Sequence, residues 1–167
     1  MPKARKEVKV RGRYAMFWGQ WPSNWEDSPM EIDGVHYNCV EQWMMAEKAR
    51  LFEDAATEAK IMAAESPADQ KRHGRRVAGY DDARWATVRY AVVLRGTLEK
   101  YRQNPHLMKK LMATGDLELV EASPEDVVWG IGMSVDHPDA ADPSKWRGQN
   151  LLGRAITEAR RILRCPG

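Results

Sequence analysis

The sequence predicts an α+β fold, a single compact and mainly α-helical domain with a small β-sheet. The chain has 167 residues, of which 43% are apolar and 30% charged, and this suits one globular domain with its own core. Several segments combine helix-start signals with apolar residues at helical spacing. Only a few short runs have the composition of strands, and Asp33-Gly34 between two of them is typical of a hairpin turn.

The first half of the chain predicts a strand, a hairpin and three helices. The strand is expected in YAMFWGQWPSNW, from Tyr14, and the hairpin in MEIDGVHY, residues 30–37. Helices are predicted from about Cys39 to Leu51, over 53–64 and over 67–74. The last of these follows a Ser66-Pro67 start signal.

The second half predicts one long helix, two more strands and a final helix. The long helix follows Asp81-Asp82 and should bury a stripe made of Trp85, Val88, Val92 and Leu98, with Ala91 beside it. Asn104-Pro105 should end it and start a helix that stops near Gly115. Strands are predicted in LELVEAS and VVWGIGM, and a last helix over 150–163.

The charge of the chain is uneven. Residues 1–13 carry six Lys or Arg and one Glu, a net +5, whereas the remainder has 20 basic and 23 acidic residues, a net −3. We therefore predict a flexible basic tail over 1–13, a domain over 14–163 and a short tail over 164–167. Such a tail is usually solvated and disordered, but it could also touch nucleic acid.

Several classes of protein are excluded by what the sequence lacks. No apolar run is long enough to span a bilayer and no secretory signal precedes the domain, so we expect a cytoplasmic protein without a membrane partner. Cys39 and Cys165 are too few for a disulfide framework. The four histidines form no zinc motif and there is no phosphate-binding P-loop, so we expect chemistry without a metal or cofactor.

The helix near residue 41 carries two charges on one face. Glu41, Met45, Lys48 and Phe52 follow one another at spacings of four, three and four residues, which places them on one stripe. In one interpretation Glu41 closes a capping box with Asn38, and both charges suit the helix dipole. In the other, the carboxylate acts as a general acid or base while the amine binds substrate or forms a Schiff base with a ring-opened sugar.

Other candidates also carry two interpretations each. Trp85 is either a core residue or a platform on which a base stacks. Arg75 in HGRR is either a solvated cation or a phosphate ligand. At the start of the last helix, Gly148 and Asn150 could present backbone N–H groups to an anion, or Asn150 could be a plain N-cap.

An ordered set of motifs resembles the NADAR, or YbiA-like, family of N-glycosidases over nearly all of residues 14–163. The motifs are PSNW, MEIDGVHYNCVEQWMMAEKA, HGRRV, RWATVRYAVVLRGTLEKYRQNP, LVEASPEDVVWGIG and KWRGQNLLGRAI. The resemblance implies a mainly helical α+β domain that cleaves the bond between a base and a phosphorylated ribose. The implied substrates are ribosylaminopyrimidine phosphates of riboflavin biosynthesis, or ADP-ribose on guanine in nucleic acid. No obligate protein partner is implied.

The resemblance also implies roles for individual residues. Glu41 would act on the sugar or its attacking water with Asp126 as its partner, and Lys48 would bind substrate or serve as a nucleophile. The implied substrate-binding residues are Asn24, Gly74, Arg75, Trp85, Trp129, Gly148 and Asn150, with the two tryptophans stacking on the base and Arg75 holding phosphate.

Two rival functions remain open from the sequence. A catalytically silent module could bind nucleotides or ADP-ribose without releasing a base. A nucleic-acid-binding protein could instead act through the basic tail, and its affinity would then fall steeply with salt.

Overall fold

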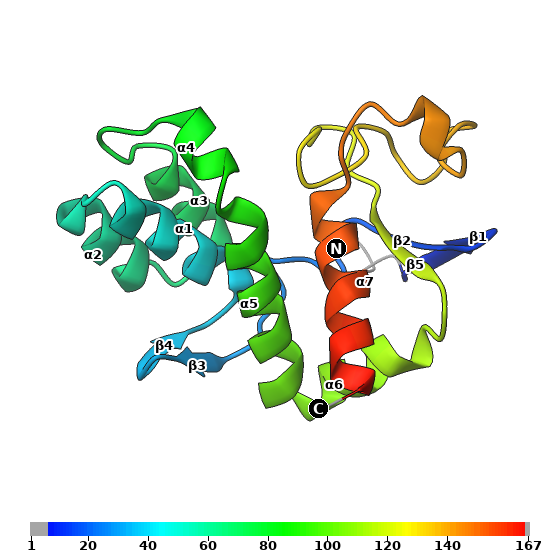
Figure 1. Cartoon of the computed structure of the whole chain (residues 1–167), viewed down its shortest axis with the longest axis horizontal. Helices are drawn as coiled ribbons and strands as arrows, with labels where there is room; N and C mark the ends of the chain where they lie inside the picture. The colour runs from blue at the N-terminus through cyan, green and yellow to red at the C-terminus, as the bar shows by residue number, and fades with distance from the viewer. Residues whose placement is uncertain (1–6, 166–167) are drawn as a thin grey trace, which may run out of the picture. The chain divides into compact units, whose positions relative to one another are not determined.

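Seven α-helices, one short 3-10 helix and two small sheets make up the part of the chain that the computed structural model describes, residues 7–165 (Figure 1). This composition confirms the predicted α+β class. The chain divides into two compact units: one is built from residues 24–105, and the other from the described residues on either side, 7–23 and 106–165. No helix of this described part is both long and apolar enough to cross a membrane.

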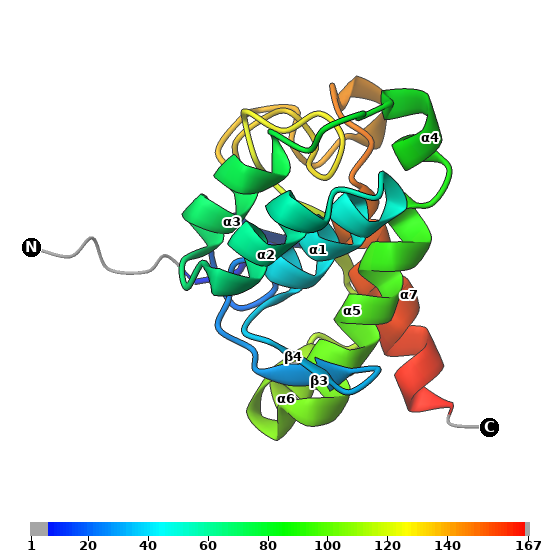
Figure 2. The same ribbon diagram turned by 90° about the vertical axis from the view of Figure 1, so that its left-hand side faces the viewer.

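The unit formed by residues 24–105 contains a β-hairpin and five helices. Its strands are β3 (Met30–Ile32) and β4 (Val35–Tyr37), and its helices are α1 (Val40–Leu51), α2 (Ala55–Ala63), α3 (Pro67–Gly74), α4 (Asp82–Ala86) and α5 (Arg89–Gln103). Helix α1 lies at the centre and contacts α2, α3 and α5 (Figure 2). We call this unit the helical unit.

Local signals place the elements of the helical unit. Asp33 and Gly34 have φ angles of 53° and 80°, as the tight turn of a hairpin requires, so the predicted hairpin is confirmed. Ser66 caps α3 by accepting a hydrogen bond from the N–H of Asp69 at 3.1 Å, and Pro67 begins that helix.

Close packing on both sides buries helix α1 almost all round. Every residue from Val40 to Ala46 is buried, as expected for a helix enclosed by others. Gly96 of α5 makes room for Trp43, because a Cβ at this glycine would lie only 2.9 Å from the indole nitrogen. That nitrogen donates a 2.8 Å hydrogen bond to the carbonyl oxygen of Val92.

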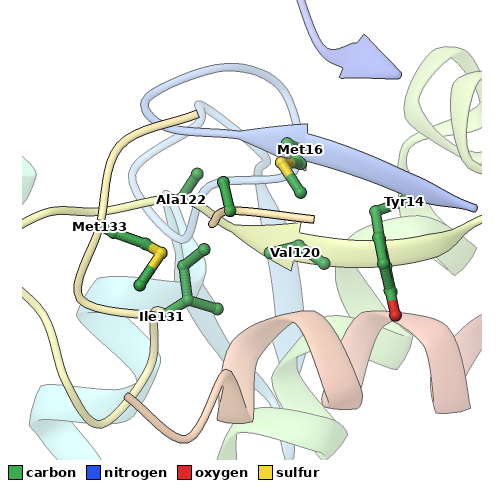
Figure 3. Close-up of a cluster of buried hydrophobic side chains, with 7 residues drawn as sticks. Tyr14, Met16, Val120, Ala122, Ile131 and Met133 are labelled. Atoms are coloured by element: carbon green, nitrogen blue, oxygen red, sulfur yellow. The ribbon is translucent and has the colours of Figure 1, made fainter. Parts of the chain in front are cut away.

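The other unit joins both ends of the described chain in a three-stranded sheet. Its strands are β1 (Lys9–Arg11), β2 (Tyr14–Phe17) and β5 (Glu118–Glu121), in the order β1-β2-β5, with β2 parallel to β5. Its helices are α6 (Pro105–Ala113), the 3-10 helix η1 (Pro143–Lys145) and α7 (Leu151–Arg164). One cluster of its buried apolar side chains comes from β2, β5 and the loop that follows (Figure 3): Tyr14, Met16, Val120, Ala122, Ile131, Met133 and Ala140. We call it the sheet unit.

The structure corrects the predicted N-terminal tail. Residues 9–11 are strand β1, and the side chains of Lys9 and Arg11 are bound to the loop after Gly132. The amine of Lys9 pairs with Asp136 at 2.9 Å, and the Arg11 guanidinium donates to the carbonyl oxygens of Val135 and His137. Residues 1–6 of the predicted tail lie outside the described part of the chain. At the other end, α7 reaches Arg164, one residue into the range predicted as a tail.

Two secondary-structure predictions were also wrong. The long helix is two helices, because Thr87 and Val88 interrupt it, and α5 buries Val93, Gly96, Thr97, Lys100 and Tyr101 rather than the predicted stripe. Of that stripe only Trp85 is buried. The segment VVWGIGM forms turns instead of a strand, because the carbonyl oxygens of 127–131 bond to the backbone before and within α7.

Candidate functional site

Helix α1 presents a carboxylate and an amine on one face of the helical unit. Glu41 lies in the first turn and only 4% of it is exposed, while Lys48 lies near the end and is half-buried. Seven residues place their Cα atoms about 10 Å apart along the helix axis, with Met45 between them. The predicted stripe is therefore present, and it keeps the carboxylate away from bulk water.

The capping interpretation of Glu41 was wrong. Cys39, rather than Asn38, is the N-cap of α1, and it makes no side-chain cap. The N–H of Asn38, the residue before the N-cap, donates instead to Oε1 of Gln42 at 2.8 Å. The Asn38 side chain is engaged elsewhere, with the carbonyl oxygen of Glu65 and the amide of Gln70. Glu41 therefore has no part in a capping box.

Lys48 connects this face of α1 to two other helices. Burial lowers the pKa of its amine, the negative charges of Glu41 and Asp82 raise it, and the positive charge of Arg75 lowers it. The charges of Glu41, Arg75 and Asp82 therefore all act on the Lys48 amine. The helical unit thus brings together three of the predicted residues, from α1 and the end of α3.

Tyr80, which lies beside Lys48 and pairs with Phe52 of the predicted stripe, was missed by the sequence analysis. The Tyr80 ring lies under the Lys48 amine, with Nζ 4.3 Å from the ring centroid, and packs edge-on against Phe52 at 5.4 Å. The Arg84 guanidinium lies 5.6 Å from the Phe52 ring. The only available signal was the position of Tyr80, directly before the Asp81 N-cap of α4.

The remaining predicted residues of the helical unit differ in accessibility. Arg75 is exposed at the end of α3, and the ion pairs found within residues 7–165 do not include it, which suits a phosphate ligand. Trp85 is 5% exposed, so little of its surface is available to a base. Asn24 is buried and its carbonyl oxygen accepts the N–H of Glu41 at 3.0 Å. Gly74 lets α3 approach α1, because a Cβ there would overlap the side chain of Met45.

The sheet unit holds the other four predicted residues, and their polar groups stabilise its loops. Oδ1 of Asp126 accepts hydrogen bonds from the N–H groups of Val128 and Trp129, at 2.9 and 2.8 Å. This arrangement is a turn closed by an aspartate side chain. Trp129 itself is half-buried and its carbonyl oxygen accepts the N–H of Leu152.

In one of the two interpretations, the backbone at the start of α7 offers free N–H groups to an anion, and the structure contradicts this interpretation. The N–H groups of residues 148–152 all donate to carbonyl oxygens of residues 127–131, at 2.9–3.2 Å. Gly148 allows this approach, since a Cβ there would lie 2.8 Å from the Cα of Val127. The N–H groups of this stretch are therefore part of the fold.

Asn150 joins α7 to the sheet. Its side-chain oxygen accepts the N–H of Glu121 at 3.0 Å and its amide donates to the carbonyl oxygen of Leu119 at 3.1 Å. Its φ angle of 51° is left-handed, which asparagine tolerates better than most residues, and its side chain does not cap the helix. The predicted plain N-cap is thus replaced by a link between β5 and α7.

The model of the NADAR domain matches residues 9–164. The chain belongs to this family. A solved structure, the NMR structure of the Escherichia coli protein YbiA, superimposes with a TM-score of 0.75 and 26% identity, covering 98% of this chain and 94% of that one. The family suggested by the ordered motifs is confirmed, and the α+β fold agrees with that structure.

Named proteins from a virus and from bacteria are similar to this chain over most of its length. The N-glycosidase R617 of Acanthamoeba polyphaga mimivirus is 38% identical over 144 residues, 86% of this chain and 85% of that protein. The N-glycosidase YbiA of Shigella flexneri is 28% identical over 141 residues, which are 84% of this chain and 79% of that protein. The riboflavin biosynthesis protein VVA0006 of Vibrio vulnificus is 29% identical over 141 residues, which are 35% of that longer protein.

The side chains of this site suggest acid–base and nucleophilic chemistry. Within the described residues, no group of three His, Cys, Asp or Glu side chains could hold a metal ion. What the helical unit supplies is a buried carboxylate, an amine with a lowered pKa and an exposed guanidinium. These groups can stabilise a cationic sugar, attack its anomeric carbon and bind phosphate.

Proposed function

We propose that this NADAR protein is an N-glycosidase that cleaves the bond between a guanine-like or pyrimidine base and a phosphorylated ribose. The observation that carries the proposal is the face of α1, where buried Glu41 lies two turns before Lys48 and influences its charge. The names of the relatives from mimivirus and Shigella support the same reaction class. The proposed substrates are ribosylaminopyrimidine phosphates or ADP-ribose on guanine in nucleic acid.

Glu41 is the proposed catalytic carboxylate. Cleavage of an N-glycosidic bond leaves positive charge on the sugar while the base departs with the bonding electrons and takes up a proton. A carboxylate near the anomeric carbon stabilises that positive charge, or removes a proton from the water that attacks it. Its burial strengthens this effect, since charges interact more strongly away from water.

Lys48 has two possible roles in this scheme. As an ammonium group it binds an anionic part of the substrate. As a free amine it attacks the anomeric carbon, the base leaves with the bonding electrons and takes up a proton, and ring opening gives a Schiff base that water hydrolyses to free the sugar and the lysine. The lowered pKa of Lys48 supports the second role, because a larger fraction of the amine is unprotonated at neutral pH.

Binding roles are proposed for the surrounding residues. Arg75 would hold phosphate through its planar fork of donors. Trp85 would contact the base with the small part of its surface that is exposed. Asn24 and Gly74 would hold Glu41 and Met45 in place, through the N–H of Glu41 and the close approach of α3. Asp126 and Trp129 keep their predicted roles as the partner carboxylate and a stacking ring.

A chromatographic base-release assay tests the proposal. Wild type and Glu41→Gln would each be given a ribosylaminopyrimidine phosphate and, separately, an oligonucleotide with ADP-ribosylated guanine. Release of the base, or recovery of the unmodified oligonucleotide, by wild type alone would support the glycosidase and identify its substrate class. No change in either substrate, with binding retained, would favour a silent nucleotide-binding module instead.

Borohydride trapping separates the two roles of Lys48. A Schiff base between Lys48 and the sugar would be reduced to a stable adduct that mass spectrometry locates on residue 48. Lys48→Arg keeps the positive charge but cannot form this adduct, so it is the matched control. Turnover without an adduct would favour the substrate-binding role.

A further inference from the structure

Tyr80 has an unusual position for an exposed aromatic residue. It is 42% exposed, yet one face of its ring is covered by the Lys48 amine, with Nζ 4.3 Å from the ring centroid. At this distance the negative face of the ring attracts an ammonium group. The contact joins the segment before α4 to the catalytic face of α1.

Two contacts fix the Tyr80 ring in this orientation. Its hydroxyl donates a 2.7 Å hydrogen bond to Oδ1 of Asp82, the first residue of α4. Its ring also makes an edge-to-face contact with the ring of Phe52, the C-cap of α1, with the centroids 5.4 Å apart and an interplanar angle of 66°. A ring held at both ends is a rigid surface, whereas the lysine side chain has four rotatable bonds.

We propose that Tyr80 is a positioning residue that holds the Lys48 amine against the face of its ring and so sets both its place and its protonation. This inference rests on the proposed function of the α1 face and adds a residue to it. Tyr80 acts through Lys48, and the ring fixes the amine at the end of the stripe that begins with Glu41.

Other charges also act on the Lys48 amine, and their effects on its pKa must be distinguished from the effect of the Tyr80 ring. Glu41 on α1 and Asp82 on α4 favour the ammonium form, whereas Arg75 at the end of α3 and burial disfavour it. Burial and Asp82 raise the pKa of Tyr80 to about 12, whereas the pKa of Lys48 is lowered, so the Tyr80 hydroxyl stays neutral over the pH range in which Lys48 loses its proton. The ring can therefore be exchanged without changing a formal charge.

The test measures Lys48 directly. The Cε chemical shift of lysine reports the protonation of its amine, so a pH titration by NMR of protein labelled with ¹³C-lysine gives the pKa of each residue. Lys48→Arg assigns the Lys48 signal. This measurement needs neither substrate nor turnover.

Three variants change the ring in graded steps. Tyr80→Leu removes the π face, so the pKa of Lys48 should fall by about half a unit. Tyr80→Phe keeps the face and loses only the bond to Asp82, so the pKa should stay close to that of wild type. Tyr80→Trp offers the strongest face and should raise it. Asp82→Asn measures the contribution of the carboxylate alone.

The variants should also affect turnover. If Tyr80 positions Lys48, Tyr80→Leu lowers kcat several-fold with little change in KM and shifts the pH profile of kcat, and Tyr80→Phe restores both. An identical Lys48 titration in Tyr80→Leu, Tyr80→Phe and Tyr80→Trp would overturn the inference. If wild type released no base from either substrate, the glycosidase proposal would fail, and the NMR titration would still decide whether Tyr80 holds Lys48.

Discussion

The two units use their polar residues differently. In the helical unit, Glu41 and Lys48 project from one face of α1, and Arg75 is exposed at the end of a helix. In the sheet unit, Asp126 and Asn150 use their side chains to bind backbone groups. Both sets come from the motifs that resemble the NADAR family, so membership in a motif does not reveal whether a residue serves chemistry or folding.

The backbone geometry explains this difference. A regular helix satisfies its own N–H and C=O groups, so its side chains remain available for a substrate. The turns over 127–133 have no such ladder. The carbonyl oxygens of residues 127–131 accept the N–H groups of residues 147–152, and Gly148 permits this approach because a Cβ there would lie 2.8 Å from the Cα of Val127. Polar residues and glycines in such turns are needed to form the fold.

The largest expected effect is on catalysis in the helical unit. Glu41→Gln keeps the shape of the side chain and removes its charge, so base release should fall by about 10²- to 10⁴-fold. The assay is the initial rate on the substrate that wild type cleaves, with circular dichroism to show that the fold is retained. A variant that keeps more than a tenth of the rate would remove Glu41 from the mechanism.

Asp126→Asn is the matched variant in the sheet unit. Asparagine keeps the Oδ1 acceptor for the two N–H groups, so the free energy of unfolding should change by less than about 1 kcal/mol. A fall in base release would then identify the charge of Asp126 as catalytic. Unchanged release would leave Asp126 with its turn-forming role alone.

The next effect is on stability in the sheet unit. Asn150→Ala removes two hydrogen bonds and places alanine in a left-handed conformation, so the free energy of unfolding should fall by about 2–4 kcal/mol. Chemical denaturation measures it. The exposed neighbour Gln149 bonds through its backbone, so Gln149→Ala is the control and should change stability by at most about 0.5 kcal/mol. Weaker phosphate binding at full stability would contradict this structural role.

A third effect concerns Lys100, the fully buried lysine of α5. Burial lowers its pKa to about 7, although the charge of Glu26 raises it. Between pH 7 and the ordinary lysine pKa the unfolded chain then binds more protons than the folded one, so stability rises with pH. From pH 7 to pH 9 the free energy of unfolding should increase by about 2 kcal/mol relative to Lys100→Met. If the free energy of unfolding changed equally with pH in wild type and Lys100→Met, the lowered pKa of Lys100 would be contradicted.

The smallest effect concerns phosphate binding. Arg75→Ala should raise KM about tenfold and leave kcat nearly unchanged, because an exposed guanidinium contributes binding that ground state and transition state share. Steady-state kinetics on a phosphorylated substrate measures both constants. Arg76→Ala removes the neighbouring exposed charge and should have little effect. Equal changes in the two variants would point to a general electrostatic attraction instead of a phosphate ligand.

Much of the fold could be predicted because its signals are local. Asp33-Gly34 imposes a hairpin turn, Ser66-Pro67 begins a helix, and the segment from Cys39 to Leu51 carries helical spacing. Predictions failed where distant partners compete. The segment VVWGIGM has the composition of a strand, but its carbonyl oxygens bind the backbone at 147–152. Lys9 and Arg11 read as part of a basic tail until their loop partners are known.

The sequence by itself determined the α+β class, the NADAR motifs and the stripe that carries Glu41 and Lys48, since helical periodicity and turn chemistry act over a few residues. Only the tertiary structure decided that Gln42 binds the backbone before α1, that Tyr80 lies against the Lys48 amine and that the N–H groups before α7 are already bonded. These contacts join residues from different elements or depend on how each backbone segment turns, and no local pattern specifies which donor meets which acceptor.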